Sequence, residues 1–207
     1  MSVNLSPAAE VLMRHTCPWW FGHILACPLR RLVQDPSAIL RPFVRPGMSV
    51  LEVGPGMGYF TPELARLVGE HGSLTVTDLQ QEMLDGTARR LSRAGFRGRT
   101  TLVRCTADDP GTGPAEFDFA LLFFMVHEVR ERSAFLERIA SSLRSGGAAL
   151  LAEPFVHVSR RSFERELAEA SEAGLGIRRD VRIRAARAAL LLKPAGGPDA
   201  PGAAGMG

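Results

Sequence analysis

The chain has 207 residues and a formal net charge of +3, with 45% hydrophobic and 23% charged residues. These values are typical of one globular domain with a sizeable core, and they exclude a fibrous or wholly disordered chain. No apolar run reaches the roughly 18 residues that span a bilayer, and the first residues lack the pattern of a signal peptide. The sequence therefore predicts a cytoplasmic protein without a membrane span.

The three cysteines, Cys17, Cys27 and Cys105, are odd in number and form no paired C-x-x-C spacing. A structural zinc site and a disulfide framework are therefore not expected, and no metal is predicted. Cys17 and Cys27 leave open a thiophilic substrate such as arsenite, but buried cysteines that pack as small apolar residues are the default interpretation.

The densest basic segment is "RRDVRIRAAR", residues 178–187. Its alternating charge favours a solvated strand face. A nucleic-acid groove is the weaker alternative, because no aromatic residues are interleaved with the arginines.

Residues 1–46 form an aromatic-rich leader that is predicted to be helical. Its helices are expected at residues 6–15, around Pro28, and at residues 35–42, where Pro42 ends the last one. Residues 195–207 are rich in Gly, Ala and Pro and are predicted to be a disordered tail. The region between them, residues 47–194, is expected to be the cofactor-binding domain.

From residue 48 onward, short apolar strands alternate with helices. The pattern predicts strands at residues 48–54, 73–79, 100–105, 117–124 and 148–154, and helices at residues 61–69, 81–95, 132–147 and 162–174. Such alternation indicates an α/β fold, a doubly wound and mostly parallel sheet with helices on both faces. Two final strands, residues 176–183 and 187–194, have nothing helical between them, so they predict an antiparallel C-terminal hairpin.

The segment "VLEVGPGMGYFT", residues 50–61, places Gly54, Gly56 and Gly58 directly after the first buried strand. In a doubly wound sheet, ligands bind at this edge, and glycines allow the backbone to approach them closely. Asp78 ends the second strand, where a carboxylate can bind both hydroxyl groups of a ribose. An adenosine-containing ligand is therefore expected, with a ligand-free glycine turn as the alternative.

Two other nucleotide sites fit this segment less well. A nicotinamide fingerprint requires G-x-G-x-x-G, whereas here the third glycine comes one residue early and Tyr59 is bulky. A P-loop is excluded because no Gly-Lys-Ser/Thr follows, and Lys193 is the only lysine.

Four segments together resemble a known family: "LEVGPGMGYFT", "VTDLQQEML", "FDFALLFFMVHEV" and "LRSGGAALLAEP". They are similar to the successive motifs of the class I S-adenosylmethionine-dependent methyltransferases, over roughly residues 40–193. The small-molecule enzymes of the ubiquinone/menaquinone-biosynthesis type are the most similar subgroup. The resemblance implies a Rossmann-like sheet of seven strands with an antiparallel seventh strand, S-adenosylmethionine as cofactor, and methyl transfer.

The resemblance also implies roles for individual residues around the methionine part and the sulfonium of the cofactor. Glu52 would organise the ammonium group, and Phe123 and Phe124 would border the sulfonium, since aromatic faces attract cations. The backbone that lines the methionine part would be that of Gly54, Pro55, Gly56 and Gly58.

At the adenosine end, the resemblance implies that Asp78 holds the ribose and Leu79 packs on the adenine. The turn "CTADD" would meet the adenine edge. The family often has an acidic residue before the alanine of this turn, whereas this chain has Thr106 before Ala107, so Asp108 is the alternative contact.

Methyl transfer requires alignment of the acceptor and, when the acceptor is protonated, a base. Among His127, Glu128, Glu153 and His157, His127 is the best candidate for the base because imidazole titrates near neutral pH. The alternative is that His127 orients the following helix, that Glu153 hydrogen-bonds a loop, and that His157 lies on the surface.

The leader offers a lid in which Trp19, Trp20 and Phe21 would cover an apolar or aromatic acceptor, although these residues could instead anchor the leader to the sheet.

A non-catalytic partner or sensor that binds the cofactor is the alternative to an enzyme. A nucleic-acid methyltransferase is disfavoured, because there is no recognition domain and no Asn/Asp-Pro-Pro-aromatic motif. The sequence leaves open the acceptor, the attacking atom and the oligomeric state, a homodimer included.

Overall fold

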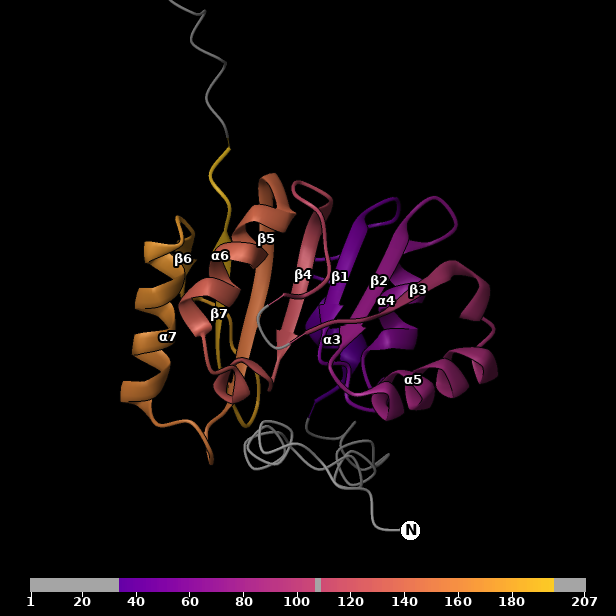
Figure 1. Cartoon of the computed structure of the whole chain (residues 1–207), viewed down its shortest axis with the longest axis horizontal. Helices are drawn as coiled ribbons and strands as arrows, with labels where there is room; N and C mark the ends of the chain where they lie inside the picture. Colours follow the sequence, from indigo (N-terminus) through magenta and orange to yellow (C-terminus); the bar gives the residue numbers. More distant parts are fainter. Residues whose placement is uncertain (1–33, 107–108, 196–207) are drawn as a thin grey trace, which may run out of the picture.

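The computed structural model describes residues 34–106 and 109–195, and within them seven strands form one sheet in the order β3-β2-β1-β4-β5-β7-β6 (Figure 1). The strands are β1 (Ser49–Val53), β2 (Ser73–Asp78), β3 (Thr100–Arg104), β4 (Phe117–Phe123), β5 (Leu143–Pro154), β6 (Gly176–Arg178) and β7 (Ala186–Leu192). The helices are α3 (Pro36–Leu40), α4 (Thr61–Val68), α5 (Gln81–Arg93), η3 (Arg97–Arg99), η4 (Val126–Glu128), α6 (Arg132–Ser142) and α7 (Arg160–Glu172).

Strands β1 to β5 pair in parallel, and β7 runs antiparallel to both β5 and β6. The arrows of the parallel strands point toward the same edge of the sheet (Figure 1). The chain moves outward from β1 to β3 and then returns to place β4 on the other side of β1, so the order reverses beside β1. The predicted fold class, a doubly wound sheet of seven strands with an antiparallel C-terminal hairpin, is confirmed.

Two apolar clusters cover the two faces of the sheet. Helices α6 and α7 contribute Phe135, Ile139 and Leu167 to one cluster, together with alternate residues of β1, β4 and β5. The other cluster joins the opposite sheet face to α3, α4 and α5, for example through Leu40 and Leu64. The central strands β1 and β4 are thus buried on both faces, as crossover helices require, whereas the edge strand β3 is only partly buried.

The helix predicted at residues 132–147 is wrong at its C-terminal end, because the chain turns directly from α6 into β5 at Leu143. Leu143 pairs with Phe117, and the register then shifts before Phe119 pairs with Ala148. Gly146 adopts a φ of 77°, which an L side chain rarely adopts. The sheet pairing of β4 therefore extends β5 backward through residues that read as helical in the sequence.

Two other local predictions are wrong. The strand predicted at residues 176–183 ends at Arg178, because the chain from residue 179 to 185 makes no ladder with β7. Arg182 and Arg184 in this segment are nonetheless exposed, as the charge alternation predicts. Thr61 is a residue type that caps helices and would be expected to precede α4, but it lies inside α4 with Phe60 at the N-cap.

Within the described ranges, no helix has both the length and the apolarity that a membrane crossing needs. The same residues contain no group of three or more His, Cys, Asp or Glu side chains that could hold a metal ion. Burial raises the pKa of the Cys105 thiol to about 11, so this thiol stays protonated at neutral pH.

Candidate cofactor and acceptor site

The glycine loop follows β1 at the point where the sheet order reverses. Gly54, Gly56 and Gly58 have φ values of 65°, 54° and 74°, a region that favours glycine. A Cβ added to Gly54 would lie 3.1 Å from Met125, and one added to Gly58 would lie 3.1 Å from Thr87. At Gly56 nothing lies within 4 Å of an added Cβ, so this glycine faces open space at the tip of the loop.

Glu52, on β1, is a buried carboxylate next to the glycine loop. Its side chain is 2% exposed, and its Oε2 has no hydrogen-bond partner within the described part of the chain. Burial raises the pKa of Glu52 to about 8; the Thr61 side chain opposes this rise, and the charge of the neighbouring Asp78 contributes to it. A cationic ligand would stabilise the charged form of Glu52, since a buried carboxylate without a partner is costly.

Asp78 ends β2, the neighbour of β1, and it is 8% exposed. Its Oδ1 accepts a hydrogen bond of 2.8 Å from the backbone N–H of Gln80, which fixes the carboxylate at the strand end. Burial raises its pKa to about 6, although the Gln80 hydrogen bond acts in the opposite direction. Leu79, which follows it, is partly exposed.

Aromatic rings continue the site at the end of β4. The ring centroids of Phe123 and Phe124 are 4.4 Å apart, and Phe60 lies at the same distance from Phe123. Phe124 has a φ of 62°, an uncommon value for a bulky residue that indicates backbone strain. Phe123 is 7% exposed and belongs to the core, so Phe124 is the more accessible of the two rings predicted at the sulfonium.

His127 and Glu153 form a hydrogen-bonded pair between η4 and the end of β5. The Nδ1 atom of His127 lies 2.5 Å from Oε2 of Glu153, and the backbone N–H of His127 donates to Oε1 at 3.1 Å. Glu153 is fully buried, whereas a quarter of the His127 side chain is exposed. The structure thus brings together two of the predicted catalytic residues, and it places His157 on the surface.

Several carboxylates influence the imidazole. Burial by itself would lower the pKa of His127, but the hydrogen bond and charge of Glu153 outweigh it, and Glu128 and Glu166 add to the effect, so the pKa is raised. When Nδ1 donates to Glu153, Nε2 of the neutral ring, which lies 4.0 Å from Oε1 of Glu128, is the atom that can accept a proton.

Glu166, on α7, is a further member of this cluster that the sequence reasoning missed. Its side chain is fully buried, and neither oxygen has a hydrogen-bond partner among the described residues. Burial and the charge of Glu153 raise its pKa to about 7. The signal was present in the sequence, because Glu166 shares a helix face with Phe163, Leu167 and Ala170.

Tyr59 and Gln34 make a second feature that sequence reasoning did not find. The hydroxyl of Tyr59 donates to the carbonyl of Gln34 at 2.8 Å, and Nε2 of Gln34 donates to the carbonyl of Arg184 at 3.3 Å. The bulky residue that argued against a nicotinamide fingerprint therefore connects the glycine loop to the chain before β7.

Several predicted site residues lie outside the described residues. They are the lid residues Trp19, Trp20 and Phe21, the cysteines Cys17 and Cys27, and Ala107 and Asp108 of the adenine turn. Their roles stay predictions.

Comparison with known proteins identifies similar methyltransferases. Residues 50–147 match the family described as "Methyltransferase domain". The ubiquinone/menaquinone biosynthesis C-methyltransferase UbiE of Shewanella pealeana is 30% identical over 109 residues, which are 53% of this chain and 43% of that relative. The chain thus matches less than half the length of this relative.

Solved structures share the fold over most of the chain. A methyltransferase from Aquifex aeolicus, described as S-adenosylmethionine-dependent, superposes with a TM-score of 0.76 at 23% identity and covers 86% of this chain and 98% of its own. One from Methanococcus maripaludis, described as putative, has a TM-score of 0.71 at 14% identity, with 95% and 99% covered.

The strand order and these matches give the chain the fold of the class I S-adenosylmethionine-dependent methyltransferases, and residues 50–147 are similar to a methyltransferase domain. Within that class, residues of the matched segment are similar to the UbiE enzymes. The family resemblance seen in the sequence is confirmed.

Proposed function

We propose that this protein transfers the methyl group of S-adenosylmethionine to a small, apolar or aromatic acceptor by in-line displacement. The observation that carries the proposal is the pair of buried carboxylates, Glu52 and Asp78, at the ends of adjacent strands beside the glycine loop. The unpartnered Oε2 of Glu52 matches a cationic ammonium group, and Asp78 suits a ribose diol.

On the cofactor side, each group of the chain has a separate task. The left-handed backbone of the glycine loop allows close approach, while Glu52 and Asp78 bind the two polar ends. Phe124 would present an aromatic face to the sulfonium. The bound cofactor supplies a methyl carbon that is already activated by the positive sulfur.

On the acceptor side, His127 would hold the proton that the acceptor loses. Glu153 orients the ring by accepting from Nδ1 and from the backbone N–H, so Nε2, which lies 4.0 Å from Oε1 of Glu128, would be the ring nitrogen that serves the acceptor. General-base assistance of this kind contributes typically about 10²–10⁴-fold. Alignment of the acceptor with the methyl carbon would supply the remaining reduction of the activation free energy, up to about 7–11 kcal/mol.

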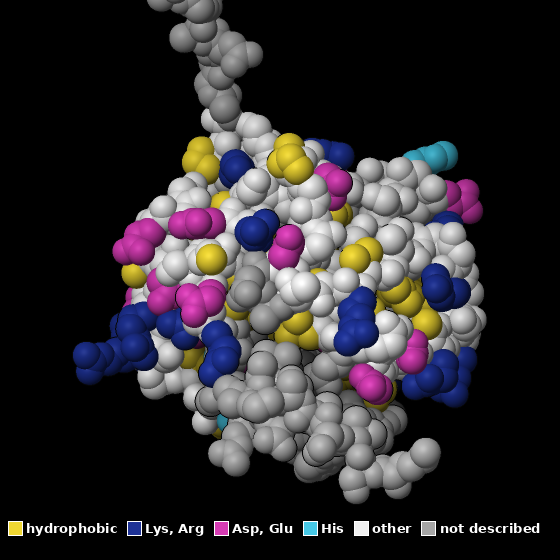
Figure 2. Space-filling view, in the orientation of Figure 1, with side chains coloured by type: hydrophobic (Ala, Val, Ile, Leu, Met, Phe, Trp, Pro, Cys, Tyr) yellow, Lys and Arg dark blue, Asp and Glu magenta, His cyan; other side chains and the backbone are white. Residues whose placement is uncertain are grey.

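The acceptor class is inferred from two observations. The similar UbiE enzyme is named a C-methyltransferase of quinone biosynthesis, which favours carbon methylation of an aromatic ring. Basic and acidic side chains are interspersed on the face shown in Figure 2, which lacks the continuous basic surface that nucleic acid would favour.

Calorimetric titration with S-adenosylmethionine, S-adenosylhomocysteine and NADH tests the cofactor first. Binding of the first two in the micromolar range, without NADH binding, is the expected result. Formation of S-adenosylhomocysteine from S-adenosylmethionine in the presence of 1,4-naphthohydroquinone then tests the acceptor class. A folded protein that binds neither sulfur compound would contradict the proposal.

A non-catalytic protein that binds the cofactor is the second candidate. Glu153 accepts hydrogen bonds from both the ring and the backbone of His127, and a pair with a purely structural role would show the same contacts. Cofactor binding without turnover of any aromatic acceptor would support this candidate over the enzyme.

A further inference from the structure

Glu166 is a carboxyl group buried on an apolar face of α7. Its neighbours on that face include Phe163 and Leu167, which belong to the same apolar cluster as Val126, the residue before His127. Glu166 is fully buried, and neither of its carboxyl oxygens has a hydrogen-bond partner within the described ranges. Because a buried carboxylate without a partner is costly, these surroundings favour the neutral, protonated carboxyl.

The polar groups that influence Glu166 are bound to other residues. Both oxygens of Glu153 accept hydrogen bonds from His127. Nε and Nη2 of Arg132, on α6, donate to the two oxygens of Glu169, each at 2.9 Å. The guanidinium that could neutralise Glu166 is therefore taken by the carboxylate one turn further along α7.

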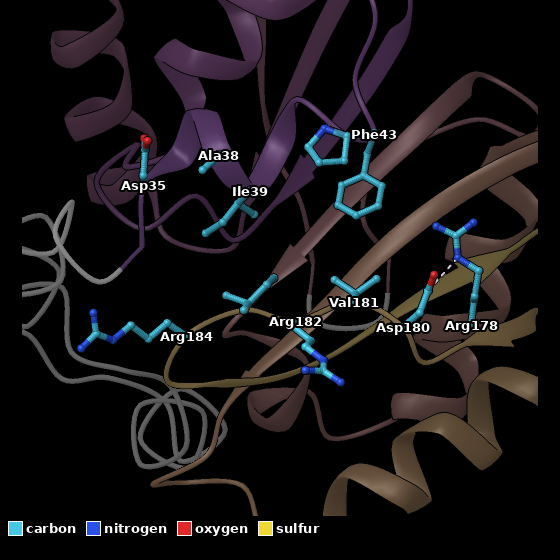
Figure 3. Close-up of a pocket in the computed structure, with 11 residues that line it drawn as sticks. Asp35, Ala38, Ile39, Phe43, Arg178, Asp180, Val181, Arg182 and Arg184 are labelled. Atoms are coloured by element: carbon cyan, nitrogen blue, oxygen red, sulfur yellow. Dashed lines mark hydrogen bonds and ion pairs between the residues drawn. The ribbon is translucent and has the colours of Figure 1, made fainter.

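The strands that pack against α7 carry two other arginines. Arg178 of β6 pairs with Asp180 at 2.9 Å, in the groove between α3 and the chain that follows β6 (Figure 3). Arg187 of β7 donates from Nε to the carbonyl of Val158 at 3.0 Å. Neither arginine forms an ion pair with Glu166 in the part of the chain that the structure describes.

The charge of Glu166 acts on the imidazole of His127. Glu153 binds Nδ1, Oε1 of Glu128 lies 4.0 Å from Nε2, and a charged Glu166 adds a third negative group that raises the pKa of the ring. Burial and the charge of Glu153 raise the pKa of Glu166 itself to about 7, from an ordinary value of 4.5. The charge of Glu166 therefore changes near neutral pH, where an imidazole also titrates.

We propose that Glu166 is a positioning residue for the base of methyl transfer and acts on His127 across Glu153. The neutral form of Glu166 leaves Nε2 of His127 ready to take the proton of the acceptor. The charged form raises the proton affinity of the ring, so that the ring serves as a base only at higher pH. The inference rests on the proposed function in naming His127 as the base, but the effect of Glu166 on the ring does not require turnover.

NMR titration of the His127 ring in the full, ligand-free chain tests this coupling. In Glu166→Gln the ring should titrate at lower pH than in the parent chain, because a negative charge has been removed. Glu166→Met, which suits the apolar face of α7, should shift the titration in the same direction and replaces the glutamine variant if that variant does not fold. Glu166→Asp keeps the carboxyl group and should bring the titration back toward that of the parent chain.

The matched control is Glu172→Gln, which removes the same charge from an exposed position at the end of the same helix and should leave the ring unchanged. The second measurement is the pH dependence of turnover with S-adenosylmethionine and 1,4-naphthohydroquinone. In Glu166→Gln the acidic limit of turnover should move to lower pH, while KM for S-adenosylmethionine stays unchanged.

Three results of the ring titration would overturn the proposal. They are an unchanged titration in Glu166→Gln, an equal shift in Glu172→Gln, and a shift in Glu166→Asp as large as that in Glu166→Gln, which would assign the effect to packing. Absence of turnover in the parent chain would instead contradict the proposed function, and the ring titration would still decide whether Glu166 acts on His127.

Discussion

Buried carboxylates stand at the ends of two pairs of strands, β1–β2 and β4–β5, and their surroundings differ. At the first pair, Oε2 of Glu52 has no hydrogen-bond partner among the described residues, and burial raises its pKa to about 8. At the second, Glu153 accepts two hydrogen bonds from His127. Oε2 of Glu52 can therefore accept a hydrogen bond from a cationic ligand, whereas both oxygens of Glu153 already accept from His127 and orient its imidazole.

The comparison shows how similar residues acquire different tasks. A buried carboxylate oxygen without a hydrogen-bond partner lowers the free energy of unfolding of the ligand-free protein. A bound cation raises that free energy again. A carboxylate already paired with histidine contributes by positioning the ring instead. Substitutions on the two sides should therefore separate binding from turnover.

The largest effect is expected for His127→Ala. If Nε2 is the general base, turnover should fall by roughly 10²–10⁴-fold, while affinity for S-adenosylhomocysteine stays within about twofold. Single-turnover kinetics and calorimetry measure the two quantities. His157→Ala is the control, since this second histidine is exposed; unchanged turnover in His127→Ala would assign the ring a structural role.

Asp78→Ala should abolish most cofactor affinity. Loss of two charge-assisted hydrogen bonds to a ribose corresponds to about a hundredfold or greater increase in Kd for S-adenosylhomocysteine. Asp85→Ala, an exposed carboxylate on α5, should leave the Kd unchanged. Equal affinities of the two variants would remove Asp78 from the site.

Glu52→Gln should weaken binding and stabilise the free protein. In the folded state Glu52 keeps its proton up to about pH 8, whereas its ordinary pKa is 4.5. The unfolded chain binds fewer protons between these values, so stability falls as pH rises from about 4.5 to 8. The variant should lack this pH-dependent loss, so its free energy of unfolding at pH 8 should exceed that of the parent chain by roughly 1–3 kcal/mol. Its affinity for S-adenosylmethionine should be about tenfold weaker.

Urea unfolding at pH 5 and pH 8 measures the stability change. Glu70→Gln, at an exposed position after α4, is the control. A variant that is stabilised equally at both pH values would contradict the role of the Glu52 proton.

The smallest effect is expected for Glu166→Gln. The charge of Glu166 helps to raise the pKa of His127, so its removal should lower that pKa. NMR titration of the His127 ring measures the shift, with Glu172→Gln of the same helix as control. A shift to higher pKa would show that the sign of the coupling is wrong.

Much of the site could be predicted because it is local in sequence. Gly54, Gly56 and Gly58 mark a left-handed loop by residue type alone, and Asp78 ends its strand as the apolar pattern indicates. Glu166 could not be placed beside Glu153 in the same way, because the two residues are brought together only by packing of α7 on the sheet.

By itself, the sequence determined the alternation of strands and helices, the glycine loop and the strand-end carboxylates, since periodicity and backbone preference act over a few residues. Only the tertiary structure decided the start of β5 at Leu143, the pairing of His127 with Glu153, and the Gln34 bridge from Tyr59 to Arg184. Each of these depends on contacts between distant segments, which local patterns do not encode.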